Sequence, residues 1–139
     1  MKVEFYDIGS VIDEQLKFAV ICSFYKEKLV LVKHKKRITW EIPGGKRETF
    51  ETIDDAAERE LFEETGATDF KIKQICNYSV TNNKEISFGA LFYCEINEIG
   101  VLPDKEIGEV KTFNNLPSNL TYPEIQPYLY DKIINYLNK

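Results

Sequence analysis

The chain has 139 residues, of which 43% are hydrophobic and 29% are charged. This length suits one folded domain with a core of its own, and the composition excludes an intrinsically disordered protein. The formal net charge of −5 argues against broad electrostatic binding of DNA, because such binding needs a positive surface. We therefore expect a single domain over residues 1–139 and no stable complex with nucleic acid.

The cysteines and the N-terminal segment indicate a cellular compartment. Cys22, Cys76 and Cys94 each lie in an apolar run, which favours buried free thiols in a reducing compartment. Residues 1–15 carry acids where a secretory signal needs an apolar run. No apolar stretch approaches the roughly 20 residues of a membrane span. These features predict a cytoplasmic protein without a membrane partner, either a monomer or a homodimer.

The first half of the chain reads as strands followed by a helix. Apolar, β-branched runs at residues 18–24 and 28–33 flank a short turn, which predicts a β-hairpin. Residues 40–45 form a short extended piece that ends in a proline and two glycines. A helix then begins at Thr52 or Asp54 and stops at Gly66. Its apolar residues recur on one side, at Ile53, Ala56, Ala57 and Leu61.

The second half adds strands and a last helix. Residues 70–80 and 86–96 are long strand candidates joined near Asn82–Asn83, and residues 109–113 form a shorter strand. Thr121 caps a C-terminal helix with an apolar face. The apolar positions of that helix are Tyr128, Leu129, Ile133, Tyr136 and Leu137. A mixed β-sheet with helices on its faces follows, in the α/β or α+β class with three layers.

The first helix carries a cluster of acids. Glu60, Glu63 and Glu64 stand at i, i+3 and i+4, so their side chains project from one helical face. Three neighbouring carboxylates need a compensating charge, since otherwise their pKa values rise and the helix is weakened. Oxygen ligands of this kind suit Mg²⁺ or Mn²⁺, and Gly44–Gly45 would let a backbone carbonyl approach the same ion. On spacing alone, a solvated acidic face explains the cluster equally well.

The residues around this cluster resemble the Nudix box, G-x5-E-x7-R-E-U-x-E-E-x-G-U, in which U is aliphatic. The matching residues are Gly45, Glu51, Arg59, Glu60, Leu61, Glu63, Glu64, Gly66 and Ala67. All seven fixed Gly, Glu and Arg positions are filled, and only Ala67 is smaller than usual. The resemblance implies an α/β/α sandwich that hydrolyses a nucleoside diphosphate linked to another moiety X.

The same resemblance implies roles for the residues of the box. Glu60, Glu63 and Glu64 would hold Mg²⁺ or Mn²⁺, and the carbonyl of Gly45 would complete the metal shell. Glu60 would alternatively, or in addition, orient or deprotonate the attacking water. Arg59 would pair with Glu51 and brace the loop against the helix.

Candidate residues outside the box are less specific. Glu106, or else Glu109, would supply a further metal ligand or base, against the alternative of an exposed loop acid. Arg37 in the basic run 33–37 is the candidate phosphate contact, against a solvated loop. We expect His34 to be a surface histidine rather than a catalytic base. Trp40 and Phe88 are expected in the core, with a base-stacking wall as the alternative.

The substrate is only weakly indicated. The later proline and tyrosine that mark the ADP-ribose and dinucleoside-polyphosphate branches are absent, since Asn83, Lys84 and Glu85 stand at those offsets. The chain is then most similar to the MutT-like branch, which hydrolyses nucleoside triphosphates, including oxidised purines such as 8-oxo-dGTP, to monophosphate and pyrophosphate. Gln126 would contact the base edge. The alternatives are ADP-ribose, a nucleotide sugar or a capped RNA end as substrate, or a non-catalytic nucleotide sensor.

Overall fold

The computed structural model describes residues 1–139 as a β-sheet between two helices. The helices are α1 (Ile53–Thr65) and α2 (Gln126–Leu137), with a short 3-10 turn at Asp13–Gln15. The strands are β1 (Lys2–Tyr6), β2 (Leu16–Tyr25), β3 (Lys28–His34), β4 (Gly44–Lys46), β5 (Ala67–Asn82), β6 (Glu85–Ile99) and β7 (Ile107–Phe113). Neither helix is long and apolar enough to cross a membrane.

The sheet is mixed, as predicted. Its strand order is β1-β5-β6-β2-β3-β7, and the short β4 pairs with β2 beside this path. β2 and β6 run parallel, whereas all the other pairs are antiparallel. This arrangement places β4, which begins with two glycines, directly beside the strand that α1 covers.

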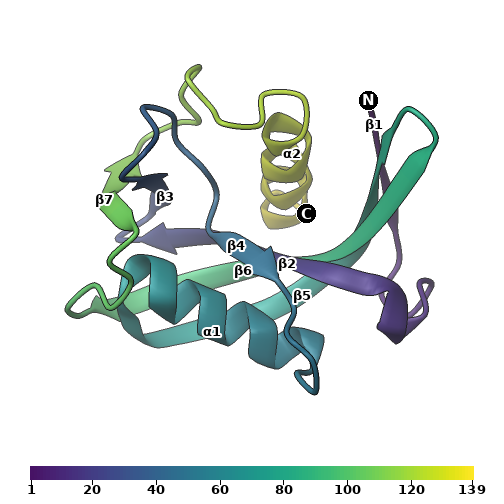
Figure 1. Ribbon diagram of the computed structural model, residues 1–139. Helices are drawn as coiled ribbons and strands as arrows, with labels where there is room; N and C mark the ends of the chain where they lie inside the picture. Colours follow the sequence, from purple (N-terminus) through teal and green to yellow (C-terminus); the bar gives the residue numbers. More distant parts are fainter.

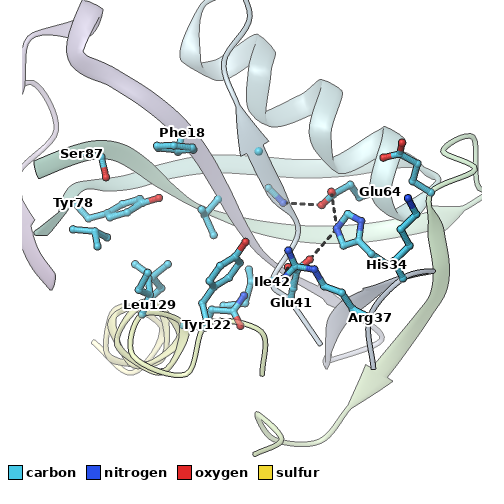
Figure 2. A pocket seen from close by; sticks show the side chains of 18 of the residues that line it. Phe18, His34, Arg37, Glu41, Ile42, Glu64, Tyr78, Ser87, Tyr122 and Leu129 are labelled. Atoms are coloured by element: carbon cyan, nitrogen blue, oxygen red, sulfur yellow. Dashed lines mark hydrogen bonds and ion pairs between the residues drawn. The ribbon is translucent and has the colours of Figure 1, made fainter. Parts of the chain in front are cut away.

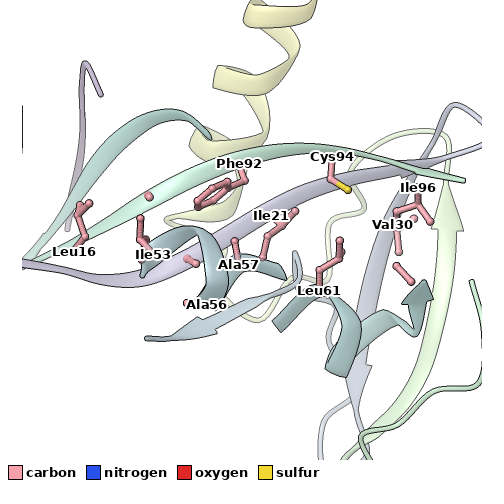
Figure 3. Close-up of a cluster of buried hydrophobic side chains, with 13 residues drawn as sticks. Leu16, Ile21, Val30, Ile53, Ala56, Ala57, Leu61, Phe92, Cys94 and Ile96 are labelled. Atoms are coloured by element: carbon pink, nitrogen blue, oxygen red, sulfur yellow. The ribbon is translucent and has the colours of Figure 1, made fainter. Parts of the chain in front are cut away.

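The two helices cover opposite faces of the sheet, which gives three layers (Figure 1). The face under α1 holds one core cluster, to which the helix contributes the predicted stripe of Ile53, Ala56, Ala57 and Leu61 (Figure 3). The face under α2 holds a second cluster, to which that helix contributes Leu129 and Ile133. The predicted α/β/α class is therefore confirmed.

The ends of α1 follow from its capping residues. The Thr52 side chain accepts a hydrogen bond from the Asp55 N–H at 3.0 Å, so Thr52 rather than Asp54 is the cap. Gly66 ends the helix with φ of 78° and donates its N–H to the Phe62 carbonyl. This left-handed conformation favours glycine. Both ends of the acidic helix are thus fixed by local sequence.

The hairpins also follow local sequence, although the strands are longer than predicted. The β2–β3 turn contains Lys26 and Glu27, both with positive φ, as a two-residue turn matched to strand twist requires. β5 and β6 extend past the apolar runs, because pairing between them continues through irregular registers to Ala67 and Ile99. Their turn includes Asn83, also at positive φ.

The prediction that Thr121 caps the C-terminal helix is wrong. α2 begins at Gln126, five residues later, and its first turn has no side-chain cap. The Thr121 hydroxyl instead shares a hydrogen bond of 2.6 Å with Thr39, and its N–H donates to the Trp40 carbonyl. These contacts hold the segment before α2 against the chain that follows β3.

The other core predictions are confirmed. Trp40 is buried and meets the ring of Phe113 edge-on, with centroids 5.0 Å apart. Phe88 is only partly buried, and it packs against the cluster under α1. The three cysteines are buried and free.

Candidate active site

The glycines of β4 lie against the acidic face of α1. A Cβ atom at Gly45 would stand 2.5 Å from the carboxylate carbon of Glu60. A side chain at this position would displace the Glu60 carboxylate, so glycine lets that carboxylate lie against the backbone. The Glu60 carboxylate therefore lies directly beside the backbone of the Gly44–Gly45 segment.

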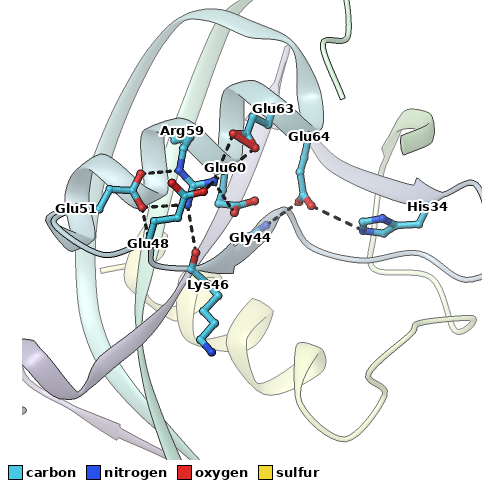
Figure 4. A network of polar contacts seen from close by, with 9 residues as sticks. All are labelled: His34, Gly44, Lys46, Glu48, Glu51, Arg59, Glu60, Glu63 and Glu64. Carbon is cyan, nitrogen blue, oxygen red and sulfur yellow. Dashed lines mark hydrogen bonds and ion pairs between the residues drawn. The ribbon is translucent and has the colours of Figure 1, made fainter. Parts of the chain in front are cut away.

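Arg59 is the centre of the polar network on this face (Figure 4). Its guanidinium donates to both oxygens of Glu51, from Nε at 2.5 Å and from Nη2 at 3.0 Å. The same group donates to Glu60 Oε1 at 2.9 Å and lies 3.4 Å from Glu63 Oε1. It also donates to the Lys46 carbonyl. Arg59 thus ties the loop, β4 and two of the acids of α1 together.

These contacts change the pKa values of the carboxyl groups in opposite directions. The hydrogen bond from Arg59 lowers the pKa of Glu51 below its usual value. Burial raises the pKa of Glu60, although Arg59 partly opposes this shift. Burial also raises the pKa of Glu64 to about 8, against the lowering effect of its hydrogen bond from the Gly44 N–H. Glu60 and Glu64 are therefore costly to ionise without a further positive charge.

Glu64 connects α1 to a second group of charged residues. Its Oε1 accepts from the Gly44 N–H at 2.9 Å, and its Oε2 lies 3.7 Å from His34 Nε2. His34 also lies 2.8 Å from Glu41 Oε2, and Arg37 lies 3.5 Å from Glu41 Oε1. The expectation of a surface position for His34 is wrong, because this side chain is partly buried between two acids.

Glu41 is a site residue that the sequence reasoning missed. It is 7% exposed, although it carries a carboxylate. Its backbone exchanges two hydrogen bonds with Val32 of β3, which holds it beside His34. The available signal was an acid between Trp40 and Ile42, since a charge within an apolar run is rarely buried without a partner.

A cleft of about 840 Å³ lies between the sheet and α2 and reaches Glu64 of α1 (Figure 2). Its charged end includes His34, Lys35, Arg37, Glu41, Glu64 and Glu106. Its apolar end includes Phe18, Val20, Ile42, Tyr78, Val80 and Leu129. A charged end and an apolar end in one cleft suit a ligand with both phosphate and ring parts.

Of the two acids considered for an accessory role, only Glu106 lines the cleft. Glu106 lines it, on the loop between β6 and β7, and its carbonyl accepts from the Lys35 N–H. Glu109 lies on β7 and pairs with Lys33 at 3.3 Å instead. Gln126 also lines the cleft, and its Oε1 is buried without a hydrogen-bond partner.

The donor set fits a hard divalent cation. The side chains of Glu60, Glu63 and Glu64 provide oxygens only, and the absence of a Cβ at Gly45 lets the Glu60 carboxylate lie close to the backbone of β4. In the conformation described, no three acidic, histidine or cysteine side chains are already gathered as ligands. Glu60 and Glu63 contact Arg59, whereas Glu64 contacts Gly44. Ligation would therefore require rotation of carboxylates that already share one helical face.

Comparisons with known proteins agree with this geometry. The sequence profile of the NUDIX domain matches residues 15–130. YtkD of Bacillus subtilis, named for an inferred 8-oxo-dGTP diphosphatase activity, is 34% identical over 103 residues. That alignment covers 73% of this chain and 64% of YtkD, so it spans less than two thirds of the relative.

Solved structures share the fold at lower identity. A mutant of the Bacillus subtilis pyrophosphohydrolase BsRppH superimposes with a TM-score of 0.80 at 23% identity, covering 96% of this chain and 90% of that one. An ADP-ribose pyrophosphatase from Streptococcus suis gives 0.68 at 18% identity, covering 88% and 91%. Nudix hydrolases generally use divalent metal cations. With the box complete from Gly45 of β4 through α1 and the profile matching residues 15–130, the chain belongs to the Nudix family.

Proposed function

We propose that the protein is a Mg²⁺-dependent pyrophosphohydrolase that cleaves a nucleoside triphosphate to a monophosphate and pyrophosphate. The observation that carries this proposal is the cleft, which joins Glu64, one of the acids of α1, to an apolar end near α2. A nucleotide has the same division between an anionic part and a ring. Mn²⁺ is the alternative cation, because its ligand preferences are similar.

Glu60, Glu63, Glu64 and the Gly45 carbonyl are the proposed metal ligands. When bound there, the metal would neutralise phosphate charge and activate water for in-line attack. Glu60 is further proposed to orient the attacking water. Arg59 holds Glu51 and Lys46, and so keeps the Gly45 loop against α1. Glu106 is the proposed accessory acid, since it lines the cleft and Glu109 does not.

The basic side chains at the charged end support a polyphosphate substrate. None of the ion pairs within the protein involves Lys35, Lys36 or Lys105, although all three line the cleft. Unpaired cations beside a metal site would attract the terminal phosphates of the substrate. Arg37, next to these lysines, is the proposed phosphate contact of defined geometry.

The base preference is proposed from the relative and from the apolar end of the cleft. YtkD is named for activity on 8-oxo-dGTP, and we propose that oxidised purine triphosphates are among the substrates here. Gln126 supports a base contact, because its buried Oε1 has no partner within the protein. An unpaired buried oxygen is costly unless a ligand satisfies it.

A screen that measures released nucleoside monophosphate as well as pyrophosphate tests this function, since ADP-ribose and nucleotide sugars release a monophosphate without pyrophosphate. Deoxynucleoside triphosphates, 8-oxo-dGTP, ADP-ribose and nucleotide sugars would be compared with Mg²⁺ and with a chelator. We expect Mg²⁺-dependent release of pyrophosphate and monophosphate from triphosphates, and much slower cleavage of the others. Faster cleavage of ADP-ribose or a nucleotide sugar would move the protein to another Nudix substrate class. Tight binding of nucleotides without any hydrolysis would identify a sensor instead.

A further inference from the structure

Three positions form a row across the floor of the cleft. Tyr78 of β5 pairs with Gly89 of β6, and Gly89 pairs in turn with Phe18 of β2. Residues paired across strands point to the same face of a sheet, and this face lies under α2. Gly89 therefore leaves a gap between two aromatic side chains on the floor of the cleft.

The ring of Tyr78 occupies that gap. A Cβ atom at Gly89 would stand 2.6 Å from both Cζ and the hydroxyl oxygen of Tyr78. The phenol end thus lies over the neighbouring strand β6 rather than over its own strand. Figure 2 shows the ring between Phe18 and Leu129, with its hydroxyl directed into the cleft. The φ of Gly89 is not positive, so the requirement for glycine here comes from space.

The Tyr78 hydroxyl lacks a hydrogen-bond partner within the protein. The side chain is 5% exposed and is packed in the cluster under α2. Burial raises the pKa of Tyr78, so the phenol stays neutral and keeps its O–H donor at neutral pH. The hydroxyl is not one of the fully buried unpaired atoms, so it stays accessible from the cleft as a donor that a ligand can reach.

A second unpaired group lines the same cleft from α2. The Oε1 atom of Gln126 is buried without a partner, and the residue is 5% exposed. Nearby walls are apolar, at Phe18, Ile42 and Leu129. An acceptor and a donor between apolar walls suit a flat heteroaromatic ring whose edge offers both a donor and an acceptor. They do not suit a phosphate, because the lysines line the other end of the cleft.

We propose that Tyr78 is a specificity-determining residue that donates a hydrogen bond to the nucleobase, while Gln126 Oε1 accepts one from an N–H of the same base. Gly89 is then a positioning residue, which acts by leaving room for the Tyr78 ring. Phe18 covers one face of the base. The inference rests on the proposed function for the identity of the ligand, a nucleotide, but it concerns recognition and not hydrolysis.

Two measurements test this role. The first is kcat and KM for the four deoxynucleoside triphosphates and 8-oxo-dGTP with Mg²⁺, for wild type and Tyr78→Phe. Loss of a contact made equally before and during reaction raises KM and leaves kcat nearly unchanged. We expect KM for the preferred nucleotide to rise about tenfold and the preference among bases to shrink by the same factor, as for one lost hydrogen bond to a base. A purely structural role would change kcat for all nucleotides alike.

The second measurement is calorimetric binding of the matching nucleoside monophosphates, which needs no turnover. Tyr93→Phe is the matched control, because it removes a phenol hydroxyl that contacts Glu95 outside the cleft. Gly89→Ala should reproduce the loss of preference by displacing the ring, with folding checked by thermal melting. Adding Tyr78→Phe to Gly89→Ala should then cost little more. If Gly89→Ala does not fold, Tyr78→Phe alone decides the question.

The outcomes separate this inference from the proposed function. The role of Tyr78 would be overturned if Tyr78→Phe kept KM within about twofold of wild type for every nucleotide. Such a change is well under the effect of one hydrogen bond. If wild type hydrolyses no nucleotide, the proposed function fails, but weaker monophosphate binding by Tyr78→Phe would still support base recognition. If the monophosphates bind wild type and Tyr78→Phe equally, or bind neither, the inference fails as well.

Discussion

Arg59 donates two hydrogen bonds to Glu51, one to each carboxylate oxygen, across the junction between α1 and the loop that leads from β4. A bidentate contact of this kind fixes orientation as well as distance. It lowers the pKa of Glu51, and it leaves Arg59 Nη1 directed at Glu60. The pair therefore connects the position of the loop to the position of a proposed metal ligand.

Lysine at position 59 should not replace this contact, since an ammonium group offers only a point charge. We expect Arg59→Lys to lower turnover by about tenfold, or ~1.4 kcal/mol, without loss of a metal ligand. The double change Arg59→Ala/Glu51→Ala should cost less turnover than the sum of the two single changes, because each single change leaves the other charge unpaired. Strictly additive losses of turnover in this double-mutant cycle would show that the two residues do not act together.

Glu41 lies within ion-pairing distance of both His34 and Arg37. Glu41→Gln removes the charge that holds these two side chains at the phosphate end, so we expect KM for a triphosphate to rise about tenfold, as for one weakened charged contact. Glu109→Gln is the control, because it removes an acid that pairs with Lys33 outside the cleft. Equal KM values for the two variants would contradict a positioning role for Glu41.

The raised pKa of Glu64 predicts how stability changes with pH when no divalent cation is present. The folded state holds a proton on Glu64 up to about pH 8, whereas the unfolded chain releases it near 4.5. The contribution of Glu64 to the free energy of unfolding is therefore fully present below pH 4.5 and is lost as the pH rises through 8. Thermal melting in a chelator should show this decline between pH 5 and 8.

Glu64→Gln should remove that part of the pH dependence, because its amide does not ionise. Glu58→Gln, which changes an exposed acid on the same helix, should retain it. A decline of equal size in wild type and Glu64→Gln would assign the pH dependence to another group.

The local parts of this site could be predicted from sequence, and the parts that depend on strand pairing could not. Glu60, Glu63 and Glu64 share a face because they stand at helical spacing, and Gly66 marks the end of that helix. His34 and Glu41 meet only because residue 41 bridges to β3. Before the sheet order was known, no spacing indicated that contact. Their contact requires the tertiary arrangement in which Glu41 bridges to Val32 of β3.

The cleft floor shows the same limit. Tyr78 and Gly89 are opposite each other in a hairpin whose register includes several irregular steps, and Phe18 joins them through a parallel pair. A hairpin could be predicted from residues 70–96, but the register could not. Thr121 was assigned to a helix because threonine is a common cap, whereas its contact with Thr39 is a tertiary one.

Divalent cation binding should stabilise the folded protein. At about a hundredfold excess over the dissociation constant, Mg²⁺ should raise the melting temperature by about 5–10 °C, through preferential binding to the native state. Glu63→Gln/Glu64→Gln should abolish this response, because both changes remove ligand charge. An unchanged shift in the double variant would place the cation elsewhere in the protein.

The most direct test of the catalytic role of α1 is the turnover of Glu64→Gln in the pyrophosphate-release assay with Mg²⁺. The amide keeps the size of the side chain and removes its charge, so melting should confirm a folded protein. We predict less than about a tenth of wild-type turnover, a loss above ~1.4 kcal/mol, while Glu58→Gln stays close to wild type. A folded Glu64→Gln protein that retains more than this fraction would contradict the assignment of Glu64 as a metal ligand.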